Sequence, residues 1–442
     1  MKGKPNIVVA GILDTKGAEI KFIAERVRAA GGEPIVLELS LREESGEADV
    51  SLSDLLLLAN RSPEALISMV RTEAAEIIVG SAVTKITEML SRNMIDGIIA
   101  FGGSTGTSMA TRIMRVLPIG LPKLMLSTMA SGDVSSYVGT RDIAMLYPIA
   151  EVGLNAITRR ILNYAAAAIV AMASPPDLPT EDIKPVIGCT MLGATTVCVL
   201  RASEHFNTSG YDVMINHAVG SGGKSIEELI TEGLIAGMLD ITTHEIADFL
   251  LGGIMGAGPD RLTAAGKMGI PQIVSTGGLD MLVFGPPGTV PQKLRDEAEQ
   301  GVPGRTIRMH NPDITIVGTT PDEAFVMGQY VAEKMNGAKG PTALTVPMRG
   351  WTAYDMAAPN IDLGWPGPGT GPFWVADLHK PEWSLRATRF LEGVNTILDR
   401  AKFNVAVIEV DRHLNEPEFA DFTARLLSEM LLGTWKKEDY EV

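Results

Sequence analysis

The stretch of sequence that decides the fold is DGIIAFGGSTGTSMATRI, residues 96–113. It opens with an apolar run that ends at Phe101, continues with a turn rich in glycine, serine and threonine, and then takes on the spacing of an amphipathic helix. A buried strand, a tight turn and a covering helix form the repeating unit of parallel α/β sheets. We therefore predict an α/β fold.

The same order of apolar run, turn and helical pattern recurs on both sides of this stretch. Strands alternating with helices imply parallel pairing through right-handed crossovers, which gives a doubly wound sheet. The strands expected in the first half are residues 7–13, 34–39, 95–101, 123–127 and 143–150, with a closing helix at 154–172.

A break in this pattern divides the chain. Residues 174–185, SPPDLPTEDIKP, combine four prolines with three acidic residues and show no apolar periodicity, so a linker is expected there. The length of 442 residues also favours two domains. We predict a first Rossmann-like domain over residues 1–175, a linker over 176–185, and a second Rossmann-like domain over 186–442, both with mostly parallel sheets. The strands expected in the second domain are residues 186–189, 212–216, 272–275, 314–317, 343–347 and 404–410.

Composition excludes several functional classes. The formal net charge of −15 argues against a nucleic-acid-binding surface, which needs clustered lysine and arginine. The longest apolar run, residues 161–173, is too short to cross a membrane. Only Cys189 and Cys198 are present, so no disulfide framework is expected and a reducing compartment fits. We expect a cytoplasmic protein without nucleic-acid or membrane partners.

The loop after the strand at 95–101 is the main candidate site. Glycines let the backbone approach a ligand closely, and the helix that follows offers free N–H groups and a partial positive charge. Such an arrangement suits a phosphate or carboxylate. The alternative is a tight turn with a Ser/Thr cap and no ligand. The residues expected to contact the ligand are Gly102, Gly103, Ser104, Thr105, Gly106 and Thr107.

Two neighbouring loops would complete this site if their strands are adjacent in the sheet. The loop GILDTKG, residues 11–17, supplies Asp14, Thr15 and Lys16, and the loop STMASGD, residues 127–133, supplies Ser131, Gly132 and Asp133. Lysine can pair with phosphate, whereas Asp14 or Asp133 could hold Mg²⁺ or a ribose hydroxyl.

The second domain has a glycine turn of its own, HAVGSGGKSIEE, residues 217–228. Ala218 stands where the P-loop pattern has its first glycine, so an ordinary anion-binding loop is the better interpretation. A further turn after residues 272–275 could face the same ligand. The residues expected to bind substrate or an anion are Gly220, Ser221, Gly222, Gly223, Lys224, Ser225, Gly277 and Gly278, with Arg261, Arg305, Arg308 and Arg349 as nearby cations.

The histidines leave a metal site open as an alternative. No pair of them has the spacing of a zinc helix motif, but His217, Asp280 and His310 could meet from distant loops. Polar residues with ordinary hydrogen-bond partners are the competing interpretation. No residue pattern names a catalytic nucleophile or base.

Five segments resemble a known family: VAGILDTKGAEI, FGGSTGTSMATRIM, MLSTMASGDVSSYVGTRDIAMLY, DITTHEIADFLLGGIMGAGPDRL and PQIVSTGGLDMLVFGP. It is the ATP-binding-domain family typified by the N-terminal domain of the plant tobamovirus-resistance protein, with uncharacterised bacterial members. The resemblance runs over nearly the whole chain. It implies two Rossmann-like halves, dimeric association, and ATP on residues 102–107 beside residues 14–16. Together with the candidate Mg²⁺ ligands above, we expect ATP with Mg²⁺ as the cofactor and a homodimer or higher homo-oligomer.

Three functions remain open. The first is an ATP-binding enzyme that acts on a small anionic metabolite in a cleft between the domains. The second is a non-catalytic module in which ATP regulates dimerisation or affinity for a partner. The third is a phosphate-ester or coenzyme A-handling enzyme that uses the second domain's glycine loops and binds no ATP.

Overall fold

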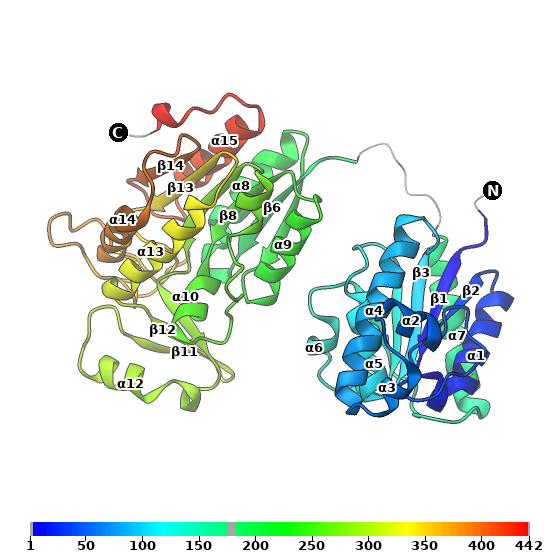
Figure 1. Cartoon of the computed structure of the whole chain (residues 1–442). Helices are drawn as coiled ribbons and strands as arrows, with labels where there is room; N and C mark the ends of the chain where they lie inside the picture. The colour runs from blue at the N-terminus through cyan, green and yellow to red at the C-terminus, as the bar shows by residue number, and fades with distance from the viewer. Residues whose placement is uncertain (1–2, 176–182, 441–442) are drawn as a thin grey trace. The chain divides into compact units, whose positions relative to one another are not determined.

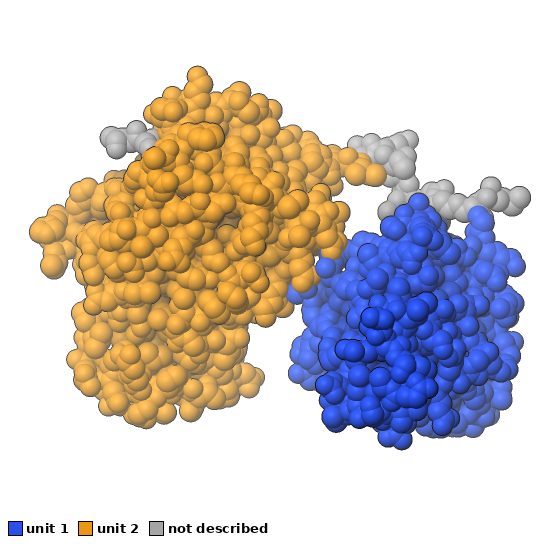
Figure 2. Space-filling view, in the orientation of Figure 1, with its two compact units in different colours: residues 1–180 blue, residues 181–442 orange. Residues whose placement is uncertain are grey.

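The computed structural model describes residues 3–175 and 183–440. The chain divides into two compact units, residues 1–180 and 181–442 (Figure 2). Most of the expected linker, residues 176–182, lies outside the described residues. Each unit is an α/β layer structure, so the predicted fold class of two mostly parallel sheets is confirmed.

The first unit contains a five-stranded parallel sheet in the order β2-β1-β3-β4-β5. Figure 1 shows β1 between β2 and β3. Alternate side chains of its strands point to opposite faces. Helices α1 and α7 cover one face and helices α2, α4 and α5 cover the other. The strands are β1 (Asn6–Gly11), β2 (Glu33–Glu38), β3 (Gly97–Gly102), β4 (Lys123–Ser127) and β5 (Ile143–Leu146); the helices are α1 (Leu13–Ala29), α2 (Leu52–Leu58), α3 (Pro63–Ile67), α4 (Arg71–Ser91), α5 (Ser104–Met114), α6 (Ser135–Val138) and α7 (Ala156–Ala173).

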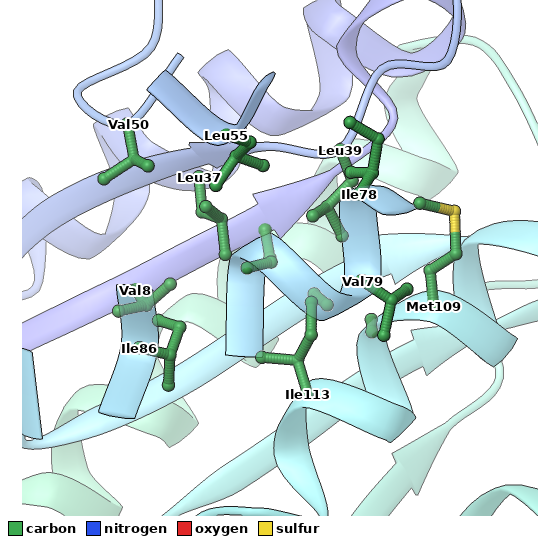
Figure 3. Packing of buried hydrophobic residues seen from close by; sticks show 14 of the residues in the cluster. Val8, Leu37, Leu39, Val50, Leu55, Ile78, Val79, Ile86, Met109 and Ile113 are labelled. Atoms are coloured by element: carbon green, nitrogen blue, oxygen red, sulfur yellow. The ribbon is translucent and has the colours of Figure 1, made fainter. Parts of the chain in front are cut away.

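One of these faces shows why the helices form. Helix α4 turns Ile78 and Ile86 toward the sheet, where they are buried with Val8 and Leu37, while Ile113 enters from α5 (Figure 3). The apolar residues of α4 recur at helical spacing, which produces one buried stripe. Burial of each such side chain contributes about 1.5–3 kcal/mol. The three helices between β2 and β3 were not among the sequence-based expectations.

The second unit contains a six-stranded parallel sheet in the order β14-β13-β9-β8-β6-β7. Its strands are β6 (Val186–Met191), β7 (Asp212–His217), β8 (Gly237–Thr242), β9 (Gln272–Gly277), β13 (Thr342–Pro347) and β14 (Val405–Val410). Its helices are α8 (Thr196–Thr208), α9 (Ser221–Thr231), α10 (His244–Leu251), α11 (Ala264–Met268), α12 (Gln292–Glu299), α13 (Pro321–Asn336), α14 (Leu385–Ile397) and α15 (Pro417–Leu431).

A small antiparallel sheet corrects one expectation. Residues 314–317 do form a strand, but β12 (Ile314–Gly318) lies between β10 (Met281–Phe284) and β11 (Ile307–Asn311) in a separate antiparallel sheet. Only Pro312 and Asp313 separate β11 from β12, and a parallel pair would need a crossover of about a dozen residues or more. The placement of 314–317 in the parallel series was therefore wrong.

Within residues 3–175 and 183–440, no helix is both long and apolar enough to cross a membrane.

Candidate functional site

The strongest candidate site lies in the first unit, where the strand order reverses. The chain winds outward from β1 to β2 on one side and to β3 on the other, so β1 and β3 are adjacent. The loops at their carboxyl ends separate at such a point and leave a crevice between them. These loops are the two that contain Lys16 and Gly103, and they share a cavity of about 430 Å³. Its lining includes seven of the predicted residues: Thr15, Lys16, Gly102, Gly103, Ser104, Thr105 and Gly106.

The glycine loop has a shape that side chains would prevent. A Cβ on Gly102 would lie 2.9 Å from the Cα of Gly106, a distance that requires the backbone to move. Helix α5 then begins at Ser104, and no side chain caps its first turn. The first N–H groups of a helix have no partner within the helix and carry a partial positive charge. The alternative of a Ser/Thr-capped turn is therefore not what the structure has.

Two cations and one carboxylate line the same cavity. The Lys16 side chain is buried, and its Nζ donates to the Glu151 backbone oxygen at 2.7 Å. Arg71, the first residue of α4, was not predicted, because a single arginine at a helix start carries no sequence signal. The Glu151 side chain is 64% exposed, and its Oε1 would lie 2.6 Å from a Cβ on Gly103. The same Oε1 lies 3.8 Å from the Nζ of Lys16, so the carboxylate forms an ion pair with this lysine at the cavity.

An adjoining cavity of about 320 Å³ shares Ile12, Thr15 and Arg71 with the first. Its lining includes Asp14, so this predicted residue faces a different compartment from Lys16. The remaining walls are mainly apolar, with Leu41, Leu66, Ile67, Met69 and Ala74.

The other predicted residues of the first unit are placed differently. Thr107 is buried, and its Oγ1 lies 2.5 Å from the Ser127 Oγ, inside the protein rather than in the cavity. Asp133 accepts a hydrogen bond from the Ser135 N–H at 2.9 Å at the start of α6, and this bond lowers the pKa of its carboxyl. Ser131, Gly132 and Asp133 line neither cavity.

In the second unit, the predicted glycine loop already holds an anion that belongs to the chain. The Oε1 of Glu245 accepts the N–H groups of Gly220 at 2.6 Å and Gly223 at 2.9 Å. Glu245 is fully buried, and Arg261 donates to its Oε2 at 2.7 Å. Arg261 also donates to both carboxylate oxygens of Asp240. Two of the N–H groups expected to bind an external anion are therefore used internally.

Close packing explains why glycine occupies positions in this loop and in the next turn. A Cβ on Gly222 would lie 1.8 Å from the His217 backbone oxygen, and a Cβ on Gly277 would lie 2.4 Å from the Ile241 backbone oxygen. Gly278 has a φ of +80°, which favours glycine. The expected anion site over residues 220–225 and 277–278 stays a prediction, but these features need no ligand to explain them.

The second unit has a separate cavity of about 370 Å³ beyond the ends of β6 and β7. One wall is a face of the antiparallel sheet, with Met281, Val283 and Ile316. Leu192 and Val197, which follow β6, form another wall. The polar residues that line it are His217, His310, Asn311, Tyr354 and Asn415.

The histidines do not assemble a metal site. Among the described residues no group of three or more His, Cys, Asp or Glu could hold a metal ion. Asp280, expected as a ligand beside His217 and His310, is buried and accepts a hydrogen bond from Thr352 Oγ1 at 2.5 Å. His413 has ordinary hydrogen-bond partners, as the competing interpretation of the histidines expected, and is buried: its Nε2 lies 3.1 Å from the Thr352 backbone oxygen, and its Nδ1 accepts the Asn415 N–H at 3.0 Å.

His413 predicts a pH dependence of stability. Burial lowers the pKa of its imidazole to about 4, below the ordinary value of about 6.5. Between these values the unfolded chain binds the proton and the folded chain does not, so stability is full above pH 6.5 and is lost as the pH falls toward 4. This residue should remove about 2 kcal/mol of stability between pH 8 and pH 5.

The measurement is urea unfolding at pH 8 and pH 5 for the wild type and His413→Gln. The variant should lose about 2 kcal/mol less than the wild type over this interval, whatever its stability at pH 8. Equal losses in the two proteins would show that His413 is not held neutral.

Comparisons with known proteins find relatives along nearly the whole chain. Residues 5–177 match the N-terminal domain of an uncharacterised protein family, UPF0261, and residues 184–362 match its C-terminal domain. A UPF0261 protein of Clostridium tetani is 37% identical over 430 residues, which cover 96% of this chain and 98% of that protein. The ToMV resistance protein Tm-1(GCR237) of Solanum lycopersicum is 30% identical over 440 residues; the match covers 94% of this chain but 54% of the tomato protein.

Similarity to solved structures is weak. The esterase domain of a Rhodothermus marinus protein aligns with a TM-score of 0.26 and 11% identity, over 57% of this chain and 88% of that domain. So low a score supports no argument about function.

Proposed function

The chain belongs to the uncharacterised protein family UPF0261, and we propose that its first unit binds ATP and that it acts as an enzyme on a small anionic metabolite. The observation that carries the nucleotide proposal is the uncapped start of α5, which faces a cavity lined by Lys16 and Arg71. Free N–H groups at a helix start, together with two cations, are the chemistry that binds a polyphosphate.

The neighbouring cavity supports a nucleotide over a free phosphate. Its apolar wall, with Leu66 and Met69, would suit the flat face of a base, and the Asp14 carboxylate can accept a hydrogen bond from a ribose hydroxyl. Glu151, at the edge of the glycine loop, offers carboxylate oxygens of the kind that bind Mg²⁺. The residues present therefore fit MgATP in kind: residues 104–106 would hold the phosphates, the Glu151 carboxylate would hold Mg²⁺, and the apolar wall would contact the base.

The proposal retains the expectations of a cytoplasmic location and of a homodimer or higher homo-oligomer. A regulatory role without chemistry is the alternative. It would be favoured if ATP binds and alters the oligomeric state, but no small acid stimulates its turnover.

The test is a calorimetric titration of MgATP, with ADP and AMP alongside, into the wild type and Gly103→Val. Gly103 has extended backbone angles that valine adopts, and its Cβ would meet only the Glu151 side chain, so the variant should fold. The added side chain would fill the phosphate position. We expect micromolar binding of MgATP to the wild type and a loss of at least about tenfold in the variant.

The matched control is Gly80→Val, in the middle of α4, where a Cβ meets open space. It should bind MgATP as the wild type does. The nucleotide proposal is wrong if folded wild-type protein gives no heat with any nucleotide, or if Gly103→Val binds with unchanged affinity.

A further inference from the structure

The cavity of the second unit is built by one face of the antiparallel sheet. Ile316 of β12 lies opposite Val283 of β10, and on its other side opposite Arg308 of β11. Residues opposite one another in an antiparallel sheet point to the same face. Arg308 therefore lies on the same face as these apolar residues; it is exposed and does not itself line the cavity, but it contacts Tyr354, which does.

Arg308 differs from most arginines of this unit in its surroundings. Five other arginines each form an ion pair with a carboxylate: Arg201, Arg261, Arg305, Arg349 and Arg386. In the described part of the chain, no carboxylate lies within ion-pair distance of Arg308. Its guanidinium instead lies 5.8 Å from the ring centre of Tyr354, which lines the cavity, and 5.2 Å from that of Trp365. The guanidinium lies within cation–π distance of both rings and is exposed, so its N–H donors are available to a ligand.

The absence of acidic residues from the described lining of the cavity also favours an anionic ligand. The chain is strongly acidic, with 53 Asp and Glu against 38 Lys and Arg, yet no Asp or Glu is among the described residues that line this cavity. Two imidazoles, His217 and His310, are among them. The Asn415 amide nitrogen, by contrast, donates to the backbone oxygens of Ala194 and Leu363 and so ties two walls together.

We propose that this cavity binds a small carboxylic acid with an apolar body, whose carboxylate meets Arg308 and His310 while its body contacts Val283 and Ile316. The volume of about 370 Å³ lies within the range of about 300–1,000 Å³ typical of small-molecule sites. A planar guanidinium is suited to a carboxylate because it donates two parallel hydrogen bonds. An organic cation would find no carboxylate in the lining. The carboxylic acid is the small anionic metabolite of the proposed function, and in this respect the inference rests on that proposal.

The experiment is a calorimetric titration of the full-length protein, without nucleotide, with straight-chain acids from butyrate to octanoate and with 3-phenylpropionate. The amide and the amine of the best-binding acid are titrated in parallel. The acid should bind saturably, and both analogues should bind at least about tenfold more weakly because they lack the anionic end.

Two variants test the placement. Arg308→Gln should weaken binding of the acid by about tenfold or more and leave the weak binding of the amide unchanged. Val197→Trp should reduce the affinity for acid and amide together, because Val197 lines the cavity and is partly exposed, so the larger ring can occupy the space. Arg425→Gln, which changes an exposed arginine on α15, is the control and should bind as the wild type does.

Three results would overturn the proposal: no acid of the panel binds saturably, the amine binds as tightly as the acid, or Arg308→Gln binds the acid with unchanged affinity. Because ATP is absent, the result does not depend on the nucleotide site. Binding of an acid by a protein that binds no ATP would leave this inference standing and reject the proposed function.

Discussion

Replacement of Arg261 by methionine is expected to lower the free energy of unfolding of the second unit by about 3–5 kcal/mol. The guanidinium is 1% exposed and contacts the carboxylates of Asp240 and Glu245, which are equally buried, with Glu227 at 3.6 Å. Methionine fills similar space but leaves these carboxylates without a counter-charge. An uncompensated buried charge is far more costly than the net stabilisation that the ion pair contributed.

The measurement is urea unfolding followed by a signal from the second unit, since two units need not unfold in one transition. Arg201→Met is the matched control, because Arg201 makes a bidentate pair with Asp421 at the surface, where its side chain is 48% exposed. An exposed pair of this kind contributes about 0–1 kcal/mol. Similar losses for the two variants would show that the buried network does not depend on Arg261.

Local patterns were sufficient to predict the parallel sheet and the glycine loop of the first unit, whereas β8 of the second sheet, Gly237–Thr242, was not among the expected strands. The run that ends at Phe101 is apolar on both faces, as a central parallel strand must be, and the glycines that follow it are required by the closeness of Gly102 to Gly106. The sequence could not show whether the strands before these two loops are adjacent. In the structure β1 and β3 are neighbours, so Lys16 and the glycine loop line the same cavity.

Long-range contacts explain what the sequence did not reveal. The loop HAVGSGGKS has the composition of an anion cradle, and the structure does place a carboxylate on it. That carboxylate belongs to Glu245, more than twenty residues later in the chain. Arg261 was expected to face a substrate, but it pairs with Asp240 and Glu245 instead. No local pattern distinguishes an anion of the chain itself from an external one.

The second cavity was hidden from sequence reasoning for the same reason. Its walls come from the segment after β6, from the antiparallel sheet and from the loop around Tyr354, which lie far apart in the chain. The basic character of Arg308 was noted, but its position opposite Ile316 depends on a strand pairing that the expected parallel arrangement of residues 314–317 excluded.

The second large effect is expected for Glu245→Ala, which removes the carboxylate that the glycine loop binds. The N–H groups of Gly220 and Gly223 and the Nε–H of Arg261 would then be buried without an acceptor. Removing one partner of a buried charged network costs about 3–5 kcal/mol. Urea unfolding of the second unit should show a loss of this size.

Formate or acetate should restore part of this stability, because each supplies a carboxylate small enough for the space that the glutamate leaves. A ligand that binds only the folded state stabilises it by mass action, even at a buried site, because binding is coupled to the unfolding equilibrium. Sodium chloride at the same ionic strength should not restore it. Glu245→Gln is the matched control: its amide fills the space, so acetate should have no effect on this variant. If acetate stabilised the wild type, Glu245→Gln and Glu245→Ala equally, acetate would be acting at another place and the glycine loop would not be its binding site.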